Sequence, residues 1–372
     1  MSTADEPLLP QGTFFFPGPT EVRAAVLAAM MRPMIPHRGA AFERLFAGLQ
    51  DSLRTIFGTT RPAFISSSSA TGLMEAGIRC APPGRVLCLV NGAFSARFAA
   101  IARACGRDVD VLDAEWGSVV EPDRVRDALR GGGHAAVTVV HSETSTGVRA
   151  DVRLITRIAR EVGATCLVDS VTGVGGAELR FDEWELDYAL TGSQKALALP
   201  PGLAFAVASE SFMASAPTAP RRGLYFDLVE FEAYAAKNQT PNTPAISLFY
   251  AAELQLEAIV AEGLARRWAR HDAMAQRTWA WADELRARHG EAFGVLASAG
   301  IRSPTITSVT LPSSLTASAI RVAVKERGFT IGGGYGQNRE TTIRIGHMGD
   351  HVLPALDRCL AACSDAIAQL SR

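Results

Sequence analysis

From about residue 64 onward, the chain alternates short apolar runs with stretches whose apolar residues recur at helical spacing. The apolar runs show no polar alternation, so both faces of the strands they predict are expected to be covered, as in a parallel sheet flanked by helices. Seven runs predict strands here: AFIS (63–66), RVLCLV (85–90), DVDVL (108–112), AAVTVVH (135–141), ATCLVD (164–169), DYALT (187–191) and LAFAVAS (203–209).

The segments between these runs predict helices at 71–80, 93–105, 121–130 and 151–163, and helical periodicity dominates 245–288. The last part predicts strands at 305–311, 329–333 and 341–347, with helices at 316–328 and after Asp350. We therefore expect an α/β fold, a mainly parallel sheet with helices on both faces plus a smaller C-terminal α+β domain. The expected boundaries are an N-terminal arm over 1–20, a large domain over 21–260 and a small domain over 261–372, with Thr20 capping the first helix.

Composition and charge narrow the function. The formal net charge of the 372 residues is −1 and no block of like charges occurs, so neither nucleic acid nor a membrane surface is expected as a partner. No apolar run approaches the roughly 20 residues that span a bilayer, and the acidic start MSTADEPLLPQG does not resemble a secretory signal. The six cysteines show no C-x-x-C spacing, which predicts reduced thiols of a cytoplasmic protein and no metal site.

Polar and reactive residues follow the predicted strands at the point where each strand ends. Ligands of open α/β sheets bind outside the carboxyl ends of the strands, so these residues are expected to share one site. They are Ser66–Thr71, Asn91–Phe94, Ser142–Gly147, Asp169 and Lys195.

Lys195 lies in LTGSQKALALPPGLAF, an otherwise small, apolar or turn-forming stretch. One interpretation is a side chain whose stem covers apolar surface while its ammonium reaches water. The other is a desolvated amine that forms an imine with a carbonyl compound. The residue alone does not decide between them.

Three other segments carry similar alternatives. The loop SSSSATGLMEA (66–76) is either a helix cap or a phosphate site at a helix N-terminus, and it lacks the P-loop pattern. Asp169 in LVDSVTGVGG is either a cap or ion-pair partner, or a carboxylate that keeps a ring nitrogen protonated. VTGVGG is not the dinucleotide fingerprint G-x-G-x-x-G. Arg344 is either a surface residue of a strand or a clamp for a carboxylate.

Nine segments together resemble the class V (fold type I) pyridoxal 5′-phosphate-dependent aminotransferases, of the alanine–glyoxylate and serine–pyruvate branch. They occur in the order of that family and cover nearly the whole chain. The segments are FPGPTEV, PMIPHRGAAFERL, SSATGLMEA, VNGAFSARFA, HSETSTGV, LVDSVTGVGG, GSQKALALPPG, TPNTPAISLFYA and TIRIGHMG.

The resemblance implies a role for each candidate residue. Lys195 would form the internal aldimine with the cofactor and move the proton, and Asp169 would pair with the pyridine nitrogen. Arg344 would clamp the substrate α-carboxylate. The remaining cofactor contacts that the resemblance implies are Phe94 on the ring face, Thr144 at the phenolic oxygen, Ser69, Ala70, Thr71 and Gln194 at the phosphate, and Thr243 at the phosphate of the neighbouring subunit in a homodimer.

Other residues have no assigned role. Thr240 aligns with a tyrosine in some relatives, and His37 and Arg38 either line the substrate entrance or order the arm. Gly332–Gly334 are expected to form a turn that brings the small domain close to the ligand.

The expected activity is transfer of an amino group from a small L-amino acid of the alanine or serine type to glyoxylate or pyruvate, by a ping-pong mechanism. Aspartate, phosphoserine, aminoethylphosphonate and ureidoglycine are alternative donors. A lyase or desulfurase on the same fold is a second alternative, although Cys359 and Cys363 lie four apart in a helical pattern typical of a core. A nicotinamide oxidoreductase or an inactive binding protein is a third, and the sequence leaves the donor, acceptor and pathway open.

Overall fold

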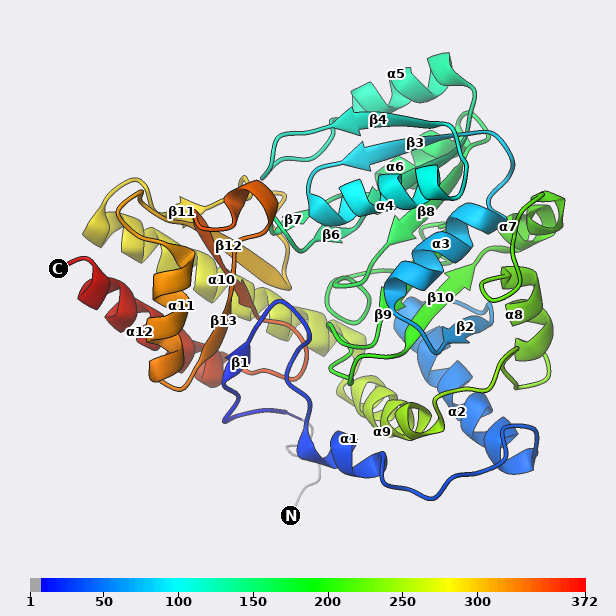
Figure 1. The fold of residues 1–372 in the computed structure, drawn as a ribbon, viewed down its shortest axis with the longest axis horizontal. Coiled ribbons are helices and arrows are strands. Elements are labelled where there is room, and N and C mark those ends of the chain that lie inside the picture. Colours follow the sequence, from blue (N-terminus) through cyan, green and yellow to red (C-terminus); the bar gives the residue numbers. More distant parts are fainter. Residues whose placement is uncertain (1–7) are drawn as a thin grey trace.

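Two sheets organise the chain, as Figure 1 shows for a computed structural model that describes residues 8–372. Residues 1–7 of the expected arm lie outside the described residues. The larger sheet is built by the first two thirds of the chain and the smaller one mainly by the last third. The expected α/β architecture is confirmed.

The larger sheet has seven strands in the order β2-β10-β9-β8-β5-β3-β4. The five strands from β9 to β4 are parallel, whereas β10 runs antiparallel to both of its neighbours, β9 and β2. The strands are β2 (Ala63–Ser66), β3 (Arg85–Val90), β4 (Val109–Asp113), β5 (His134–Val140), β8 (Thr165–Asp169), β9 (Tyr188–Gly192) and β10 (Ala204–Ala208).

Helices cover both faces of this sheet, which explains why its strands are apolar throughout. Val86 and Cys88 of β3 pack toward α3 and α4, while Leu87 and Leu89 pack toward α5 and α6 on the opposite face. The helices around this sheet are α1 (Ala24–Ala29), α2 (Ala40–Phe57), α3 (Ala70–Cys80), α4 (Ala93–Ala104), α5 (Pro122–Gly132), α6 (Val152–Arg160), α7 (Glu210–Ser215), α8 (Leu228–Ala235) and α9 (Ile246–Glu262). A 3-10 turn (Ala216–Thr218) follows α7, and the short hairpin of β6 (Ser142–Glu143) and β7 (Val148–Arg149) follows β5.

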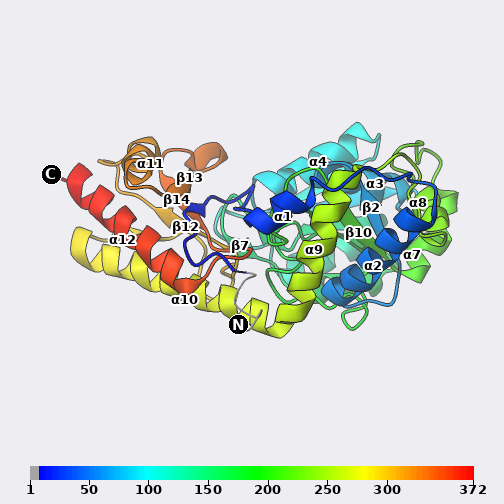
Figure 2. The ribbon, with the colours of Figure 1, turned by 90° about the horizontal axis from the view of Figure 1, so that it is seen from below.

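The smaller sheet has the order β1-β13-β14-β12-β11. Figure 2 shows the long helix α10 running from the end of α9 to lie beside α12 under this sheet. Its strand β1 comes from the N-terminal arm and pairs with β13 in parallel, so the arm is anchored in the smaller sheet. The elements are β1 (Phe14–Phe15), α10 (Leu264–His289), β11 (Gly294–Val295), β12 (Ile306–Thr310), α11 (Ala317–Glu326), β13 (Thr330–Gly333), a 3-10 turn (Gly336–Asn338), β14 (Thr342–Gly346) and α12 (Leu353–Leu370).

Two expectations about local structure are wrong. Thr20 does not cap a helix: α1 begins at Ala24, and the Thr20 hydroxyl instead donates to the carbonyl of Lys195 at 3.0 Å. Gly332 and Gly333 belong to strand β13 rather than to a turn. Position 332 requires a glycine because Pro17 of the arm packs against it, and a Cβ there would lie 2.6 Å from the proline ring.

None of the helices in the described part of the chain combines the length and apolarity needed to cross a bilayer.

Candidate active site

The ends of the parallel strands bring the expected site residues to one edge of the larger sheet. Asp169 is the last residue of β8, and Lys195 comes three residues after β9. Phe94 lies in the first turn of α4, just after β3. Thr144 lies between the two strands of the hairpin that follows β5. The expectation that reactive residues gather at strand ends is therefore met for these four.

Lys195 is a buried amine in a chain that has only three lysines. The other two, Lys237 and Lys325, are exposed. The Lys195 Nζ donates to the carbonyl of Pro17 at 2.6 Å and lies 5.9 Å from the centroid of the Phe94 ring. Burial, and to a lesser extent the charge of Arg344, lowers the pKa of Lys195 to about 8. A side chain whose ammonium reaches water is therefore not what the structure shows.

Asp169 is a buried carboxylate that interacts electrostatically with that amine, and only 3% of it is exposed. One of its oxygens, Oδ1, accepts a hydrogen bond from the Val171 N–H at 2.9 Å. Burial raises the pKa of the Asp169 carboxyl to about 7, although the Val171 N–H and the charge of Lys195 oppose the rise. A cationic group facing the second oxygen would favour the ionised form.

His141 supports the segment that carries Asp169. Its backbone N–H donates to the Asp169 carbonyl at 2.8 Å, and its Nδ1 lies 2.9 Å from the Ser170 hydroxyl. Burial lowers the pKa of His141 to about 3, so the ring is neutral. His141 also lines a cavity of about 430 Å³ whose lining does not include Lys195.

Phe94 is oriented by a buried carboxylate that lies in the expected segment Ser142–Gly147 but had no role assigned from the sequence. Glu143 accepts hydrogen bonds from the backbone N–H groups of Phe94 and Ser95, at 3.1 and 2.9 Å, and so caps the start of α4. It also accepts from the N–H and hydroxyl of Ser145. An acidic side chain is favourable at a helix N-terminus, where free N–H groups need acceptors. The signal in the sequence is the acidic residue directly before Thr144.

Arg344 joins the smaller sheet to this edge. Its Nε donates to the Gly333 carbonyl at 2.7 Å and its Nη1 to the Thr144 carbonyl at 3.1 Å. Burial lowers the pKa of Arg344 to about 10, a value that is still high enough for the side chain to be cationic at neutral pH. No ion pair joins it to a carboxylate among residues 8–372, so the remaining N–H groups are available to an anion.

Tyr335 covers Arg344 and was also missed by sequence reasoning. Its ring lies 5.6 Å from the Arg344 guanidinium carbon and 5.6 Å from the Phe94 ring. The Arg97 Nη2 approaches its hydroxyl at 3.4 Å. Tyr335 therefore packs near Arg344 of the smaller sheet and near Phe94 beside the larger sheet. Its place in a polar, glycine-rich loop did not indicate this.

The expected phosphate residues lie at the start of α3. Ser69 is the N-cap residue but its side chain makes no capping hydrogen bond, while Ala70 and Thr71 lie in the first turn. Gln194 lies beside them, because a Cβ on Gly192 would be 2.8 Å from Gln194 Oε1 and 3.3 Å from Ala70 Cβ. Free N–H groups at a helix N-terminus favour an anion.

Thr243 is not brought to Lys195 in the single chain. It is exposed, in a loop that is tied to the α3 side of the site where the Ala245 N–H donates to Ser67 Oγ at 2.9 Å. Thr240 in the same loop is buried and its hydroxyl donates to the Asn242 carbonyl. Arg38 donates to the Pro241 carbonyl at 3.1 Å, so that residue helps to order the loop.

These residues fit pyridoxal 5′-phosphate, the cofactor that the resemblance implies. The site offers a buried amine, an aromatic face and a helix N-terminus. The N-cap residue of that helix, Ser69, makes no capping hydrogen bond with its side chain. Asp169 accepts a hydrogen bond from the described residues through one oxygen, leaving the other for a ring N–H. The donor set matches an aldehyde that carries a basic ring nitrogen and a phosphate.

Comparisons with known proteins agree with this fit. The family model of the class-V aminotransferases matches residues 24–335. An L-aspartate–glyoxylate aminotransferase of Paracoccus denitrificans is 32% identical, over 91% of this chain and 87% of the relative. A serine–glyoxylate aminotransferase of Methylorubrum extorquens is 31% identical, over 90% of this chain and 86% of the relative.

A solved structure supports the same assignment. The crystal structure of an alanine–glyoxylate aminotransferase from Nostoc sp. superposes with a TM-score of 0.88 at 30% identity, covering 96% of each chain. The chain therefore belongs to the class-V aminotransferase family and is a transaminase of fold type I that depends on pyridoxal 5′-phosphate.

Proposed function

We propose that this transaminase moves an amino group from a small L-amino acid, of the alanine or serine type, to a small 2-oxo acid such as glyoxylate or pyruvate. The observation that carries the proposal is the single buried lysine, Lys195, which lies 5.9 Å from the Phe94 ring and interacts electrostatically with Arg344 and Asp169. Two half-reactions, one for the donor and one for the acceptor, give ping-pong kinetics.

Lys195 and Asp169 are the proposed catalytic pair. When bound, pyridoxal 5′-phosphate supplies an aldehyde that condenses with amines and a ring that withdraws electrons from the substrate Cα. Lys195 Nζ takes the proton from that Cα, a role for which a pKa of about 8 suits an amine near neutral pH. Asp169 accepts a hydrogen bond from the ring nitrogen and keeps it protonated, and the cationic ring in turn favours the ionised carboxylate.

Arg344 is the proposed clamp for the substrate carboxylate. Two of its N–H groups are held by the carbonyls of Gly333 and Thr144, which fixes the plane of the guanidinium before a substrate arrives. A preorganised planar fork binds a carboxylate through two parallel hydrogen bonds and orients the Cα–H toward Lys195.

The remaining proposed contacts hold the cofactor. Phe94 covers one face of the ring, and Thr144 donates to its phenolic oxygen. Ser69, Ala70, Thr71 and Gln194 bind the phosphate at the start of α3. Thr243 completes the phosphate site of a neighbouring subunit in a homodimer, a role that its exposure on the surface of one chain supports.

We also propose the arrangement of the whole molecule. It is a homodimer whose subunits each consist of an arm over 1–20, a large domain over 21–260 and a small domain over 261–372. A cytoplasmic location is supported by its six cysteines, all of which are free thiols in the structure.

The choice of donor rests on the relatives. Those named for glyoxylate differ in donor: serine, alanine, aspartate and (S)-ureidoglycine all occur in their names. Glyoxylate is the shared acceptor, which favours it here. Aspartate, phosphoserine, aminoethylphosphonate and ureidoglycine remain the alternative donors.

A desulfurase is disfavoured by its need for an accessible nucleophilic cysteine. Cys359 and Cys363 lie on the buried face of α12, and burial raises the pKa of Cys359 well above its usual value.

The test is an absorbance spectrum of the purified protein with pyridoxal 5′-phosphate, repeated after adding L-alanine, L-serine or L-aspartate singly. We expect a visible band that bleaches with alanine or serine and returns when glyoxylate is added. Bleaching with aspartate alone would assign an alternative donor. Absence of a visible band with the cofactor would contradict the proposed chemistry.

A further inference from the structure

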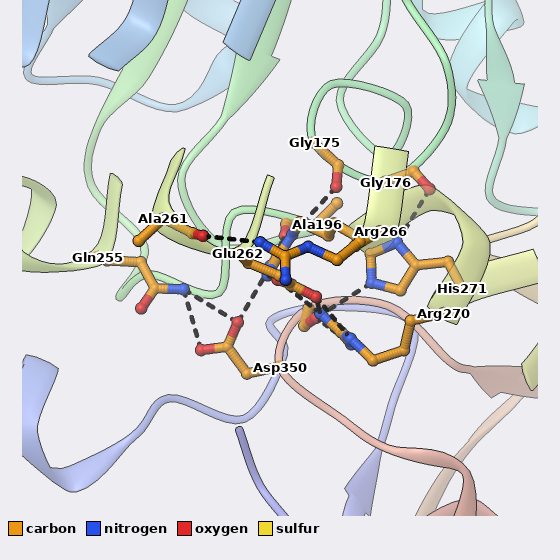
Figure 3. Close-up of polar contacts among 12 residues, drawn as sticks. Gly175, Gly176, Ala196, Gln255, Ala261, Glu262, Arg266, Arg270, His271 and Asp350 are labelled. Atoms are coloured by element: carbon orange, nitrogen blue, oxygen red, sulfur yellow. Dashed lines mark hydrogen bonds and ion pairs between the residues drawn. The ribbon is translucent and has the colours of Figure 1, made fainter. Parts of the chain in front are cut away.

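A buried cluster of charged and polar side chains lies at the start of α10, and Figure 3 shows most of it in close-up. Seven residues form this cluster, the α10 junction: Arg23, Gln255, Glu262, Arg267, Arg270, His271 and Asp350. Charged groups are rarely buried unless they are paired, so a cluster of this size needs a reason.

Arg267 is the most enclosed arginine of the α10 junction, with 1% of its surface exposed. Its Nη2 donates to the Ala196 carbonyl at 2.8 Å and to Asp350 Oδ1 at 3.0 Å. Its Nε donates to the Gly175 carbonyl at 3.1 Å, and its Nη1 pairs with Glu262 at 2.7 Å. Charge-assisted hydrogen bonds of this kind are stronger than neutral ones.

These contacts join the three segments that carry the proposed catalytic and substrate-binding residues. Ala196 directly follows Lys195, Gly175 lies six residues after Asp169, and Asp350 lies six residues after Arg344. In Figure 3 the carbonyls of Gly175, Gly176 and Ala196 converge on the cluster that holds the Asp350 carboxylate.

His271 repeats this arrangement one helical turn further along α10. It lies four residues after Arg267, on the same face of the helix. Its Nδ1 lies 2.9 Å from the Gly176 carbonyl and its Nε2 lies 3.0 Å from the Gly349 carbonyl. Burial lowers the pKa of His271 well below its usual value, so the ring is neutral and donates to one of these two carbonyls. His271 therefore adds one hydrogen bond between α10 and the loop after β8 or β14.

The backbone of Lys195 is held from the opposite side by the N-terminal arm. The Thr20 N–H donates to the Gln194 carbonyl at 2.9 Å, and its hydroxyl donates to the Lys195 carbonyl at 3.0 Å. With Arg267 on Ala196, three consecutive carbonyls around the amine are fixed from outside the segment. Arg23, three residues after the end of the arm, joins the α10 junction, where its Nε pairs with Asp350 at 2.8 Å.

A buried ion pair is weak support for stability, because apolar residues of similar volume fill a core as well. What an arginine adds is a fixed set of donor directions, which an apolar side chain lacks. Transamination needs such precision, because the amine must reach a substrate proton and small displacements of reacting groups are costly.

We propose that Arg267 is a positioning residue for transamination: by holding the carbonyls of Ala196 and Gly175, it fixes the Lys195 segment relative to that of Asp169. This inference rests on the proposed function of those two residues. Arg267 touches neither the cofactor nor the substrate and acts through the backbone.

The test compares Arg267→Met with Arg270→Met as a matched control. Both arginines are largely buried in the α10 junction and pair with Glu262, but Arg270 donates to the carbonyls of Gly349 and His351 instead. A general effect of losing a buried charge should therefore appear in both variants, whereas a positioning effect on Lys195 should appear only in the first.

The first readout is amide hydrogen exchange in the cofactor-free protein. The Ala198 and Leu199 amides donate to the carbonyls of Lys195 and Ser193, and the Gly176 and Ala177 amides to that of Gly173. We expect Arg267→Met to speed exchange at these amides by about tenfold or more, and Arg270→Met to leave them within about twofold of the parent protein.

The second readout is the isolated half-reaction of the loaded enzyme with its amino acid. We expect Arg267→Met to slow it by about tenfold or more without a matching rise in KM, and to shift the pH midpoint of the visible band. Arg267→Lys, which keeps the charge but not the fork, should fall between the two. If Arg267→Met does not fold, Arg267→Lys carries the test.

Equal responses of exchange and rate to the Arg267 and Arg270 substitutions would overturn the inference. If Arg267→Met does not fold, an Arg267→Lys protein with the same amide exchange and the same rate as the parent protein would also overturn it. Amide exchange in the cofactor-free protein does not depend on the amino donor. A failure of the positioning role can therefore be distinguished from a failure of the proposed function. A parent protein without a visible band refutes the proposed function, whereas a reactive parent with an equally reactive Arg267→Met refutes only the positioning role.

Discussion

The amine of Lys195 lies 2.6 Å from the carbonyl oxygen of Pro17 and donates a hydrogen bond to it. The two residues are 178 positions apart, and the arm that carries Pro17 is anchored in the smaller sheet through β1. The reactive amine of one sheet is thus held by a segment of the other. Gly18, the next residue of the arm, packs directly against the lysine stem.

Substitution of Gly18 by alanine should disturb Lys195. The Gly18 φ of +127° disfavours any side chain, and a Cβ there would collide with the Cδ, Cε and Nζ atoms of Lys195. Overpacking typically costs about 1–3 kcal/mol, so we expect attachment of pyridoxal 5′-phosphate to be about tenfold slower or more. The measurement is the growth of the visible band after the cofactor is added to the cofactor-free protein.

Gly163→Ala is the control for backbone strain. Gly163 also has a positive φ, +74°, but a Cβ there meets nothing within 4 Å. The Gly163→Ala variant should have a lower melting temperature than the parent protein and the same rate of cofactor attachment. Equal attachment rates for Gly18→Ala and the parent protein would show that the arm does not control the amine.

Attachment of the cofactor should depend on pH through the amine. Imine formation needs the neutral form, and burial lowers the pKa of Lys195 to about 8. The rate of attachment should therefore rise with pH up to about 8 and level off above it. A rate that still rises in proportion to hydroxide well above pH 9 would indicate a lysine with an ordinary pKa of about 10.4.

Asp169→Asn should stabilise the cofactor-free protein at neutral and alkaline pH. Burial raises the folded pKa to about 7, while the unfolded chain ionises near pH 3.9. Between these values the folded state binds the extra proton, so the parent loses about 1.4 kcal/mol of stability per pH unit as pH rises. The advantage of the variant should grow from pH 5 to pH 7 and then stay constant.

Denaturant unfolding at several pH values measures this effect, with Asp51→Asn as an exposed control. The same Asp169→Asn variant should lose transamination by about 10²-fold or more, because a neutral amide does not hold the ring nitrogen protonated. A stability gain that is equal at pH 5 and pH 8 would contradict the raised pKa.

Arg344→Lys should separate substrate binding from cofactor binding. A lysine lacks the planar fork, and losing charge-assisted hydrogen bonds typically costs about 1.5–3 kcal/mol. We expect kcat/KM for the amino acid to fall by about 10- to 100-fold while the visible band of the bound cofactor remains. Arg339→Lys, an exposed position in the adjoining loop, should leave kcat/KM within about twofold. Loss of the band in the first variant would assign Arg344 to the cofactor instead.

The sheet and its reactive edge followed from local pattern. The runs AFIS and RVLCLV coincide with β2 and β3 residue for residue, because a strand covered on both faces must be apolar throughout. Asp169 and Lys195 were identifiable because they are polar residues placed at the end of such a run or just after one. The break at Gly263 between α9 and α10, with a φ of +81°, marks a division that periodicity alone did not show.

The contacts that orient the site were not predictable, because they join residues far apart in sequence. Thr20 looked like a helix cap, the usual role of a threonine before a helix, yet it donates to Lys195, 175 positions away. Arg267 looked like one charged residue among many on α10, and nothing local indicates that its side chain is buried. Tyr335 lies in a short loop whose position depends on how the smaller sheet meets the larger one.

The attachment site of the cofactor is tested most directly by chemical trapping. The protein is loaded with pyridoxal 5′-phosphate, reduced with borohydride and digested, and the peptides that carry the added mass are identified. Three lysines compete for the label, and we expect it on Lys195 alone, the one that is buried and lies near the Phe94 ring. Label on Lys237 or Lys325, or no label at all, would contradict the assignment of Lys195 as the catalytic amine.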